Sequence, residues 1–298
     1  MGATLRIVRR RIRSVQSTKK ITRAMELIAS SRILKAQQRV EASRPYALQL
    51  TEAMEDVAKH VGGEFSHPLL EVREQPTRVG VLVITSDRGL AGAYNTNVLK
   101  IAEGILGQVR DRGLEPVVYV VGKKGVGYFR FRGVPLEASW QGISEVPPYE
   151  GALEIGHRLV DDFADGDIDE LWCAYTDFRS AFTMRAASQR FLPIAHEEVA
   201  GKGTRLAHAE YVFEPGPGEI LNHLLPQYIV TKVYAGLLES AASENASRRR
   251  AMKAATDNAE EIIKVLTRQA NRARQDEITT EISEIVGGAE ALSGASGE

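Results

Sequence analysis

Two long segments at the ends of this 298-residue chain lack the residues that break helices, and no other feature constrains the fold as strongly. Residues 3–44 contain neither Gly nor Pro, and the same is true of residues 237–286. Because an α-helix rises about 1.5 Å per residue, these segments predict helices of about 60 Å and about 75 Å. A globular helix averages only about 11–12 residues. The sequence therefore predicts two long terminal helices and one compact middle region, a plan typical of a rod or scaffold rather than of an enzyme.

The C-terminal segment carries a heptad repeat. Positions taken in alternating steps of three and four residues from Tyr228 to Ala273 are apolar at ten of fourteen places. Such a repeat predicts a left-handed coiled coil. Many of these residues are alanines, so the partner helix is expected to approach closely, and the polar Asn245 and Arg249 can fix the register. The seam positions beyond this polar pair are Met252, Thr256, Ala259, Ile263, Leu266, Ala270 and Ala273.

The N-terminal segment begins with one apolar stripe and then becomes apolar on most faces. Leu5, Val8, Ile12 and Val15 lie on one side of the expected helix, whereas residues 21–36 place apolar side chains nearly all round it. A helix of this kind is enclosed on more than one side. One partner helix cannot enclose it, so either the middle region or other chains must cover the rest.

The C-terminal helix is longer than its expected antiparallel partner and should extend past it. Ile278, Ile282, Ile285 and Val286 form an apolar stripe on this extension, beside several glutamates. An apolar stripe on an unpaired helix is typical of a docking surface, although folding back onto the core is an alternative. The pair of glycines at 287–288 is expected to end the helix.

The middle region alternates between strand and helix patterns. Continuous apolar runs at 79–85, 116–121 and 170–176 predict strands buried on both faces, and helical patterns at 95–112 and 150–163 separate them. This alternation predicts βαβ units and an α/β domain with an open, mainly parallel sheet. The expected organisation is an N-terminal coiled-coil helix at 1–60, the α/β domain at 76–195, a C-terminal coiled-coil helix at 208–288 and a flexible tail at 289–298.

The sequence offers no motif for catalysis or metal binding. Loops 86–92 and 122–127 follow two of the expected strands and contain Gly, but neither fits the dinucleotide fingerprint or the P-loop. The six histidines are scattered, without the i, i+4 spacing of a metal-binding pair. Cys173, the single cysteine, falls in an apolar run and is expected to be a buried hydrophobic residue. We therefore expect no catalytic residue, no cofactor and no metal, and no apolar run is long enough to predict a membrane span.

Several segments, in colinear order, resemble signatures of the γ subunit of F-type ATP synthases of the bacterial type. In the N-terminal helix they are SVQSTKKITRAME at 14–26 and ASRPY at 42–46. TSDRGLAG at 85–92 matches the turn after the first strand of that family. AMKAATDN at 251–258 and ARQDEITTEISEIVGG at 273–288 match its C-terminal signature.

The resemblance implies a rotor shaft. In this family an antiparallel coiled coil fills the bore of a hexamer of α and β subunits, and a Rossmann-like domain, together with the ε subunit, grips the ring of c subunits. The chain would then couple proton flow to ATP synthesis or hydrolysis by rotation, as a non-catalytic subunit at the cytoplasmic face of the bacterial plasma membrane, meeting the membrane only through the complex. The residues that match the family's contacts with the hexamer are Lys20, Arg23, Met25, Arg248, Gln275, Thr279, Glu281, Ile282 and Ile285.

Two other functions fit parts of the sequence. The first 25 residues hold eight Lys or Arg and no acidic residue, so a coiled-coil protein that binds nucleic acid is one alternative. No aromatic residues are interleaved there for base stacking, and we expect no nucleic-acid partner. A nucleotide-dependent enzyme using loop 86–92 is the other alternative. Salt-dependent retention on DNA would favour the first, and saturable nucleotide binding would favour the second.

Overall fold

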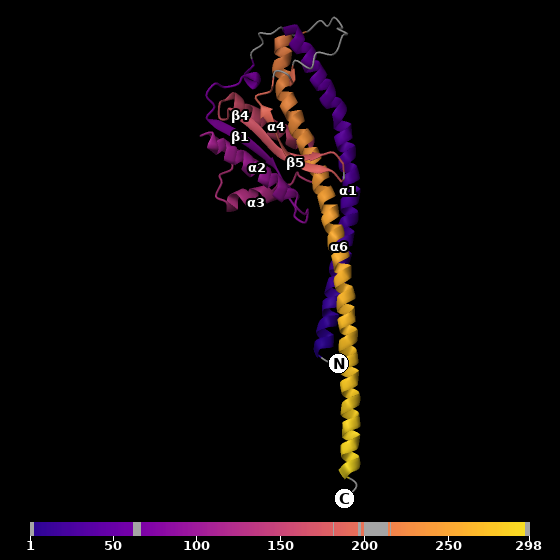
Figure 1. Cartoon of the computed structure of the whole chain (residues 1–298). Helices are drawn as coiled ribbons and strands as arrows, with labels where there is room; N and C mark the ends of the chain where they lie inside the picture. The colour runs from indigo at the N-terminus through magenta and orange to yellow at the C-terminus, as the bar shows by residue number, and fades with distance from the viewer. Residues whose placement is uncertain are drawn as a thin grey trace. The chain divides into compact units, whose positions relative to one another are not determined.

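A computed structural model of the chain describes residues 3–61, 67–180, 182–195, 198–199, 214 and 216–295. The chain divides into two compact units. Unit 1 comprises Met1–Ile28 with Arg249–Glu298, and unit 2 comprises Ala29–Arg248. The two long helices, α1 (Ala3–Val61) and α6 (Pro217–Ala295), contribute to both units (Figure 1).

Unit 2 contains a five-stranded sheet in the order β3-β2-β1-β4-β5. The first four of these strands run parallel, and β5 is antiparallel to β4. This is the open, mainly parallel sheet that the alternating pattern predicts. The elements between the long helices are η1 (Pro68–Leu70), β1 (Arg78–Ile84), α2 (Tyr94–Asp111), β2 (Glu115–Val121), α3 (Lys123–Phe131), β3 (Ala138–Trp140), α4 (Tyr149–Ala164), β4 (Glu170–Phe178) and β5 (Met184–Leu192).

The central strands send alternate side chains into two apolar clusters. On β1, Leu82 and Ile84 enter one cluster, whereas Val81 and Val83 enter the other. The first cluster also contains residues of α1, α4 and α6, and the second contains residues of α2 and α3. Figure 1 shows these two groups of helices on opposite sides of the sheet. Because helices cover both faces, the strands are buried on both sides, which explains their continuous apolar runs.

The sequence pattern does not predict strands β3 and β5. β3 has only three residues, too few for a period to be recognised. β5 lies at the edge of the sheet, and most of its nine residues are half-buried or exposed. It therefore lacks the continuous apolar run that marks the central strands.

The ends of α6 differ from the expected ones. The helix begins at Pro217 rather than at 208, and residues 208–213 lie outside the described part of the chain. At the other end it continues through Gly287 to Ala295, so the expected helix end and the start of a flexible tail at 289 are not found. Gly287 does not adopt the positive φ of a glycine cap. A glycine inside a helix costs only about 1 kcal/mol relative to alanine, so the helix can continue.

In unit 1, α1 and α6 pair as antiparallel helices. The hydroxyl oxygens of Thr22 and Thr256 lie 2.7 Å apart, and Lys19 Nζ lies 3.1 Å from Glu260 Oε2. The partner's number on α6 rises as the number on α1 falls, which defines the antiparallel direction. The α6 positions of the predicted seam are all buried or half-buried, which confirms the heptad repeat there: Met252, Thr256, Ala259, Ile263, Leu266, Ala270 and Ala273.

Candidate functional site: exposed surfaces of the long helices

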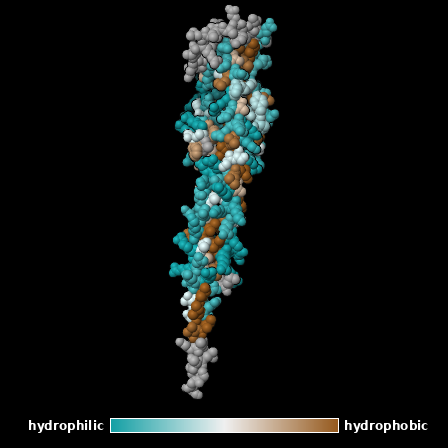
Figure 2. Space-filling model, turned by 90° about the vertical axis from the view of Figure 1, so that its right-hand side faces the viewer, coloured by the Kyte–Doolittle hydropathy of each residue, from teal (hydrophilic) through white to brown (hydrophobic). Residues whose placement is uncertain are grey.

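The last described turns of α6 carry an exposed apolar stripe. Ile278, Ile282 and Ile285 are 47%, 56% and 71% exposed, and Val286 beside them is also exposed. Figure 2 shows hydrophobic side chains gathered at this end of the helix. α6 continues as one helix to Ala295, and among the described residues no side chain covers this stripe. A contiguous exposed apolar surface of this kind marks an interaction site.

The other residues expected to contact partners on α6 share the face of this stripe. At about 100° per residue, positions 275, 278, 279, 281, 282, 285 and 286 fall within an arc of about 160°. Gln275, Thr279 and Glu281 are all exposed. Thr279 Oγ1 donates to the Gln275 carbonyl at 2.9 Å, so its lone pairs face outward as acceptors. The structure thus assembles one face with an apolar centre, flanked by Thr279 on one edge and Glu281 on the other.

The three expected contact residues on α1 do not share one face. Lys20 and Arg23 are exposed neighbours, and Arg23 Nη1 donates to Glu26 Oε2 at 2.9 Å. Met25 is half-buried. It lies about 140° round the helix from Lys20 and about 200° from Arg23, and so is not beside them. The basic pair and Met25 would therefore meet different groups.

A basic surface lies at the start of α1. Arg6, Arg9, Arg10 and Arg13 are exposed and, together with Ile12, line an open hollow of about 510 Å³. Four guanidinium groups around one hollow create a positive potential that favours an anionic partner surface.

Apolar residues of α1 remain exposed beyond its seam. Ile21, Leu27, Ile28 and Leu34 are each more than half exposed. The sequence left open whether the middle region or other chains cover this helix. Within the described part of the chain these side chains are not covered, so they are available to other chains.

Arg248 is buried rather than presented to partners, with an exposure of 6%. Its Nη2 donates to Glu244 Oε1 at 2.6 Å and approaches the carbonyls of Arg88 and Gly89 at 3.4 Å and 3.3 Å. Burial raises the pKa of Glu244, and the positive charge of Arg248 acts in the opposite direction. Arg248 therefore acts inside unit 2, and a contact with a partner would require these bonds to break.

The sequence reasoning missed the acidic partners of Arg248. Glu244 precedes it by four residues on the same helix, a spacing that could have signalled the pair. Glu145, whose Oε1 lies 4.0 Å from Arg248 Nη1, is 103 positions away in sequence and gives no such signal.

The loops at the carboxyl edge of the sheet are filled by the chain's own groups. Asp87 Oδ1 accepts from the backbone N–H of Lys123 at 3.1 Å, and Thr85 Oγ1 accepts from that of Gly125 at 2.9 Å. A Cβ at Gly122 would lie 2.4 Å from the Thr85 carbonyl oxygen. The backbone N–H groups of Lys123 and Gly125, in the loop after β2, thus have partners within the chain. Among the described residues, no group of His, Cys, Asp and Glu is placed to hold a metal.

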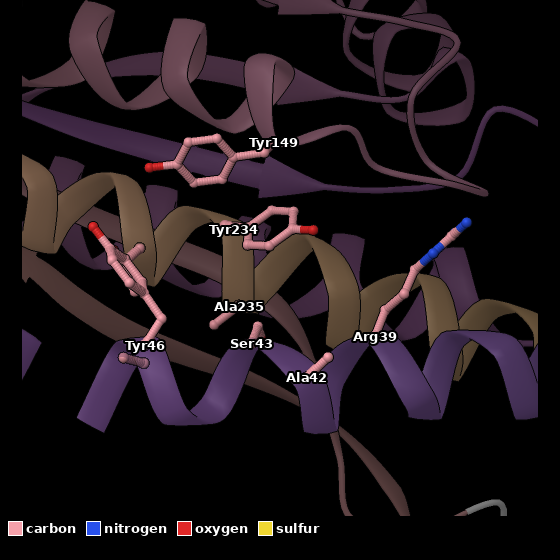
Figure 3. Close-up of a pocket in the computed structure, with 9 residues that line it drawn as sticks. Arg39, Ala42, Ser43, Tyr46, Tyr149, Tyr234 and Ala235 are labelled. Atoms are coloured by element: carbon pink, nitrogen blue, oxygen red, sulfur yellow. The ribbon is translucent and has the colours of Figure 1, made fainter. Parts of the chain in front are cut away.

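A second hollow, of about 480 Å³, lies within unit 2 where α1, α6 and the start of α4 meet. Tyr149 and Tyr234 pack edge to face with ring centroids 5.4 Å apart, and Tyr46 and Arg39 line the same hollow (Figure 3). The Tyr149 hydroxyl accepts a hydrogen bond from Gln227 Nε2. Burial raises the pKa of Tyr149, so its hydroxyl stays protonated at neutral pH. Aromatic rings and one cation suit packing rather than catalysis.

A helical pair with a basic start, uncovered apolar residues and an apolar tip defines a subunit of a larger assembly. A family model described as ATP synthase matches residues 4–292. The ATP synthase gamma chain of Thermobifida fusca is 53% identical over 303 residues, covering 99% of each chain. That of Mycolicibacterium smegmatis is 53% identical over 309 residues, covering 99% of this chain and 100% of the relative. The chain belongs to the family of ATP synthase gamma chains.

Solved structures share the fold. A chain of the central stalk and c-ring of the mitochondrial ATP synthase of Tetrahymena thermophila is 26% identical, with a TM-score of 0.57, over 79% of this chain and 99% of its own. A chain of the Euglena gracilis mitochondrial ATP synthase is 16% identical, with a TM-score of 0.67, over 100% of this chain and 97% of its own. Through the described residues, no helix combines the length and apolar character needed to cross a membrane.

Proposed function

We propose that the chain is the central rotor shaft of an F-type ATP synthase, which couples proton flow through the membrane sector to ATP synthesis or hydrolysis at a hexamer of α and β subunits. Full-length identity of 53% to ATP synthase gamma chains is the observation that carries this proposal. The antiparallel helical pair of unit 1 and the exposed stripe of α6 support it, because a shaft needs an outer surface that other chains enclose.

The shaft itself is non-catalytic in this proposal. Its partners are the α and β subunits, the ε subunit and the c-subunit ring, and it sits at the cytoplasmic face of the bacterial plasma membrane as a peripheral subunit.

The proposed contacts with the hexamer are of two kinds. The tip of α6 offers an apolar face to a hydrophobic sleeve, through Ile282 and Ile285 with Gln275, Thr279 and Glu281 around them. Lys20 and Arg23 offer charge to acidic loops of β, and Met25 contacts the hexamer from another face of α1. Arg248 supports the shaft from inside unit 2 instead of touching the hexamer.

Co-purification and rotation test the proposal. The tagged chain, expressed with the α and β subunits of the same complex, should bring both down with ATPase activity. A bead attached to the chain should then rotate when ATP is added. ATP turnover by the pure chain above background would contradict the non-catalytic role. Failure to bring down the α and β subunits would contradict the proposed shaft function.

Two variants test the contact face. Ile282→Ser with Ile285→Ser should weaken retention of the chain in the hexamer, because the stripe loses its apolar area. Thr280→Ser is the matched control, since Thr280 is exposed about 180° round the helix from the centre of that face. Equal retention of both would refute this placement of the contact.

A further inference from the structure

Glu145 lies at the centre of a charged cluster in unit 2. Its Oε1 accepts from Arg32 Nη1 at 2.6 Å, and it lies 3.5 Å from Arg88 Nη1 and 4.0 Å from Arg248 Nη1. The three arginines come from three segments: α1, the loop after β1, and α6. The carboxylate is therefore hydrogen-bonded to α1 and attracts the arginines of α6 and of the loop after β1 by charge alone.

The loop that carries Glu145 is fixed to the end of β1. Ser144 N donates to Asp87 Oδ2 at 3.0 Å, and Asp87 N donates to Ser144 Oγ at 2.8 Å. Burial alone would raise the pKa of Asp87, but backbone N–H groups, including those of Ser144 and Lys123, outweigh it and leave the pKa below its usual value. The Asp87 carboxylate thus stays charged and holds the loop at neutral pH.

The main apolar cluster lies farther along both helices, and smaller buried apolar residues continue from it toward the charged cluster. On α1 the core cluster begins at Leu50, which is 18 positions from Arg32, or about 27 Å along the helix. On α6 it ends at Leu237, which is 11 positions from Arg248, or about 16 Å. The charged cluster is thus a second attachment, close to the positions where unit 2 ends on both helices.

The two attachments resist different motions. Apolar contacts oppose separation but have little directional preference. Charge-assisted hydrogen bonds require one geometry and so oppose rotation of a helix about its own axis.

We propose that Glu145 is a positioning residue that locks α1 and α6 against rotation relative to the α/β domain, so that torque passes between the domain and the helical pair. The inference rests on the proposed shaft function. It assigns to the loop before α4 a role in coupling.

Hydrogen exchange on the full chain tests the lock without any assay of function. Glu145→Gln keeps the shape of the side chain but removes its charge. Exchange at the amides of Asp87 and Ser144 should rise about tenfold or more, since the loop keeps its bonds to Asp87 but loses its charge-assisted bond to Arg32 on α1. Glu150→Gln, an exposed change nearby, should leave both amides unaffected. Unchanged exchange in the Glu145 variant would overturn the lock.

Coupling in the assembled complex tests the role. Glu145→Gln should lower proton pumping in membrane vesicles at an unchanged rate of ATP hydrolysis, whereas Glu150→Gln should preserve both. Wild-type complexes that hydrolyse ATP without pumping would count against the shaft function itself. Wild-type and Glu145→Gln complexes that pump equally would overturn the inference alone.

A cross-link provides the rescue that a purely structural role would not show. Arg32→Cys with Glu145→Cys removes the ion pair, and a short bismaleimide can then join the two thiols. The native Cys173 is buried and should not react. Proton pumping should be lost in the double variant and restored by the cross-link. This test does not depend on whether the Glu145→Gln variant assembles. No restoration after complete cross-linking would overturn the proposal.

Discussion

Gly156 on α4 lies close to Val230 on α6, and its replacement by alanine tests this packing. A Cβ at this position would lie 2.6 Å from Val230 Cγ2 and 2.9 Å from Val230 Cα. The second contact is with backbone, so no rotamer change can relieve it and one helix must move. Overpacking of this kind costs about 1–3 kcal/mol, whereas the higher helix propensity of alanine returns about 1 kcal/mol.

The net loss of about 0–2 kcal/mol corresponds to a Tm lower by up to about 8 °C, measured by circular dichroism on the isolated chain. Gly104→Ala is the matched control, because Gly104 lies on α2 with no atom near its would-be Cβ. That control should raise the Tm by about 2–4 °C. Adding Val230→Ala to Gly156→Ala should recover part of the loss, because it removes the nearer contact. A Gly156→Ala chain that gains as much in Tm as the Gly104→Ala control would refute the packing described here.

Three further predictions concern titratable groups. Burial and the nearby Asp177 raise the pKa of Glu239 to about 7, so the folded state loses stability as pH rises from about 4.5 through 7 and this carboxyl ionises. Glu239→Gln should therefore stabilise the chain at pH 8 and much less at pH 5. Equal gains in stability at the two pH values would contradict this prediction. Asp169 accepts bonds from Arg73 and from the backbone N–H groups of Thr77 and Arg78, which outweigh burial and hold its pKa below the usual value. The stabilisation by the Asp169 carboxylate is present above about pH 4 and is lost as pH falls through its folded-state pKa. Asp169→Asn should therefore lower the free energy of unfolding at pH 7 by about 1.5–3 kcal/mol but have little effect under strongly acidic conditions. Urea unfolding measures both values. Burial raises the pKa of the Cys173 thiol, so a thiol reagent should label it only after unfolding. Rapid labelling of the native chain would show that Cys173 on β4 is accessible to solvent.

The predicted elements are those whose signal lies within one segment. The seam from Met252 to Ala273 follows from a period in its own residues, and β1, β2 and β4 follow from runs long enough to be buried on both faces. The edge strand β5 lacks such a run because one side of it has no neighbour. The helix end expected at Gly287 fails because glycine permits a cap but does not impose one.

Of the candidate site, too, only the part whose signal lies within one segment could be predicted from the sequence. The stripe of Ile278, Ile282 and Ile285 is exposed as expected, since its spacing alone places it on one face. The burial of Arg248 depends on Glu145 and on the loop after β1, which the fold brings close from distant parts of the sequence. A run of three arginines cannot show which member turns inward.

In the antiparallel register of unit 1, the described residues of α1 do not reach the last part of α6. Thr22 opposite Thr256 and Lys19 opposite Glu260 place the start of α1, at Ala3, opposite about position 275. Residues 276–295 then form a single helix about 30 Å long. Two helices joined side by side resist bending far more than one, because bending must stretch one and compress the other. The tip is thus the compliant element in series with a stiff pair, and whatever surrounds it must act as a bearing that keeps it straight while it turns.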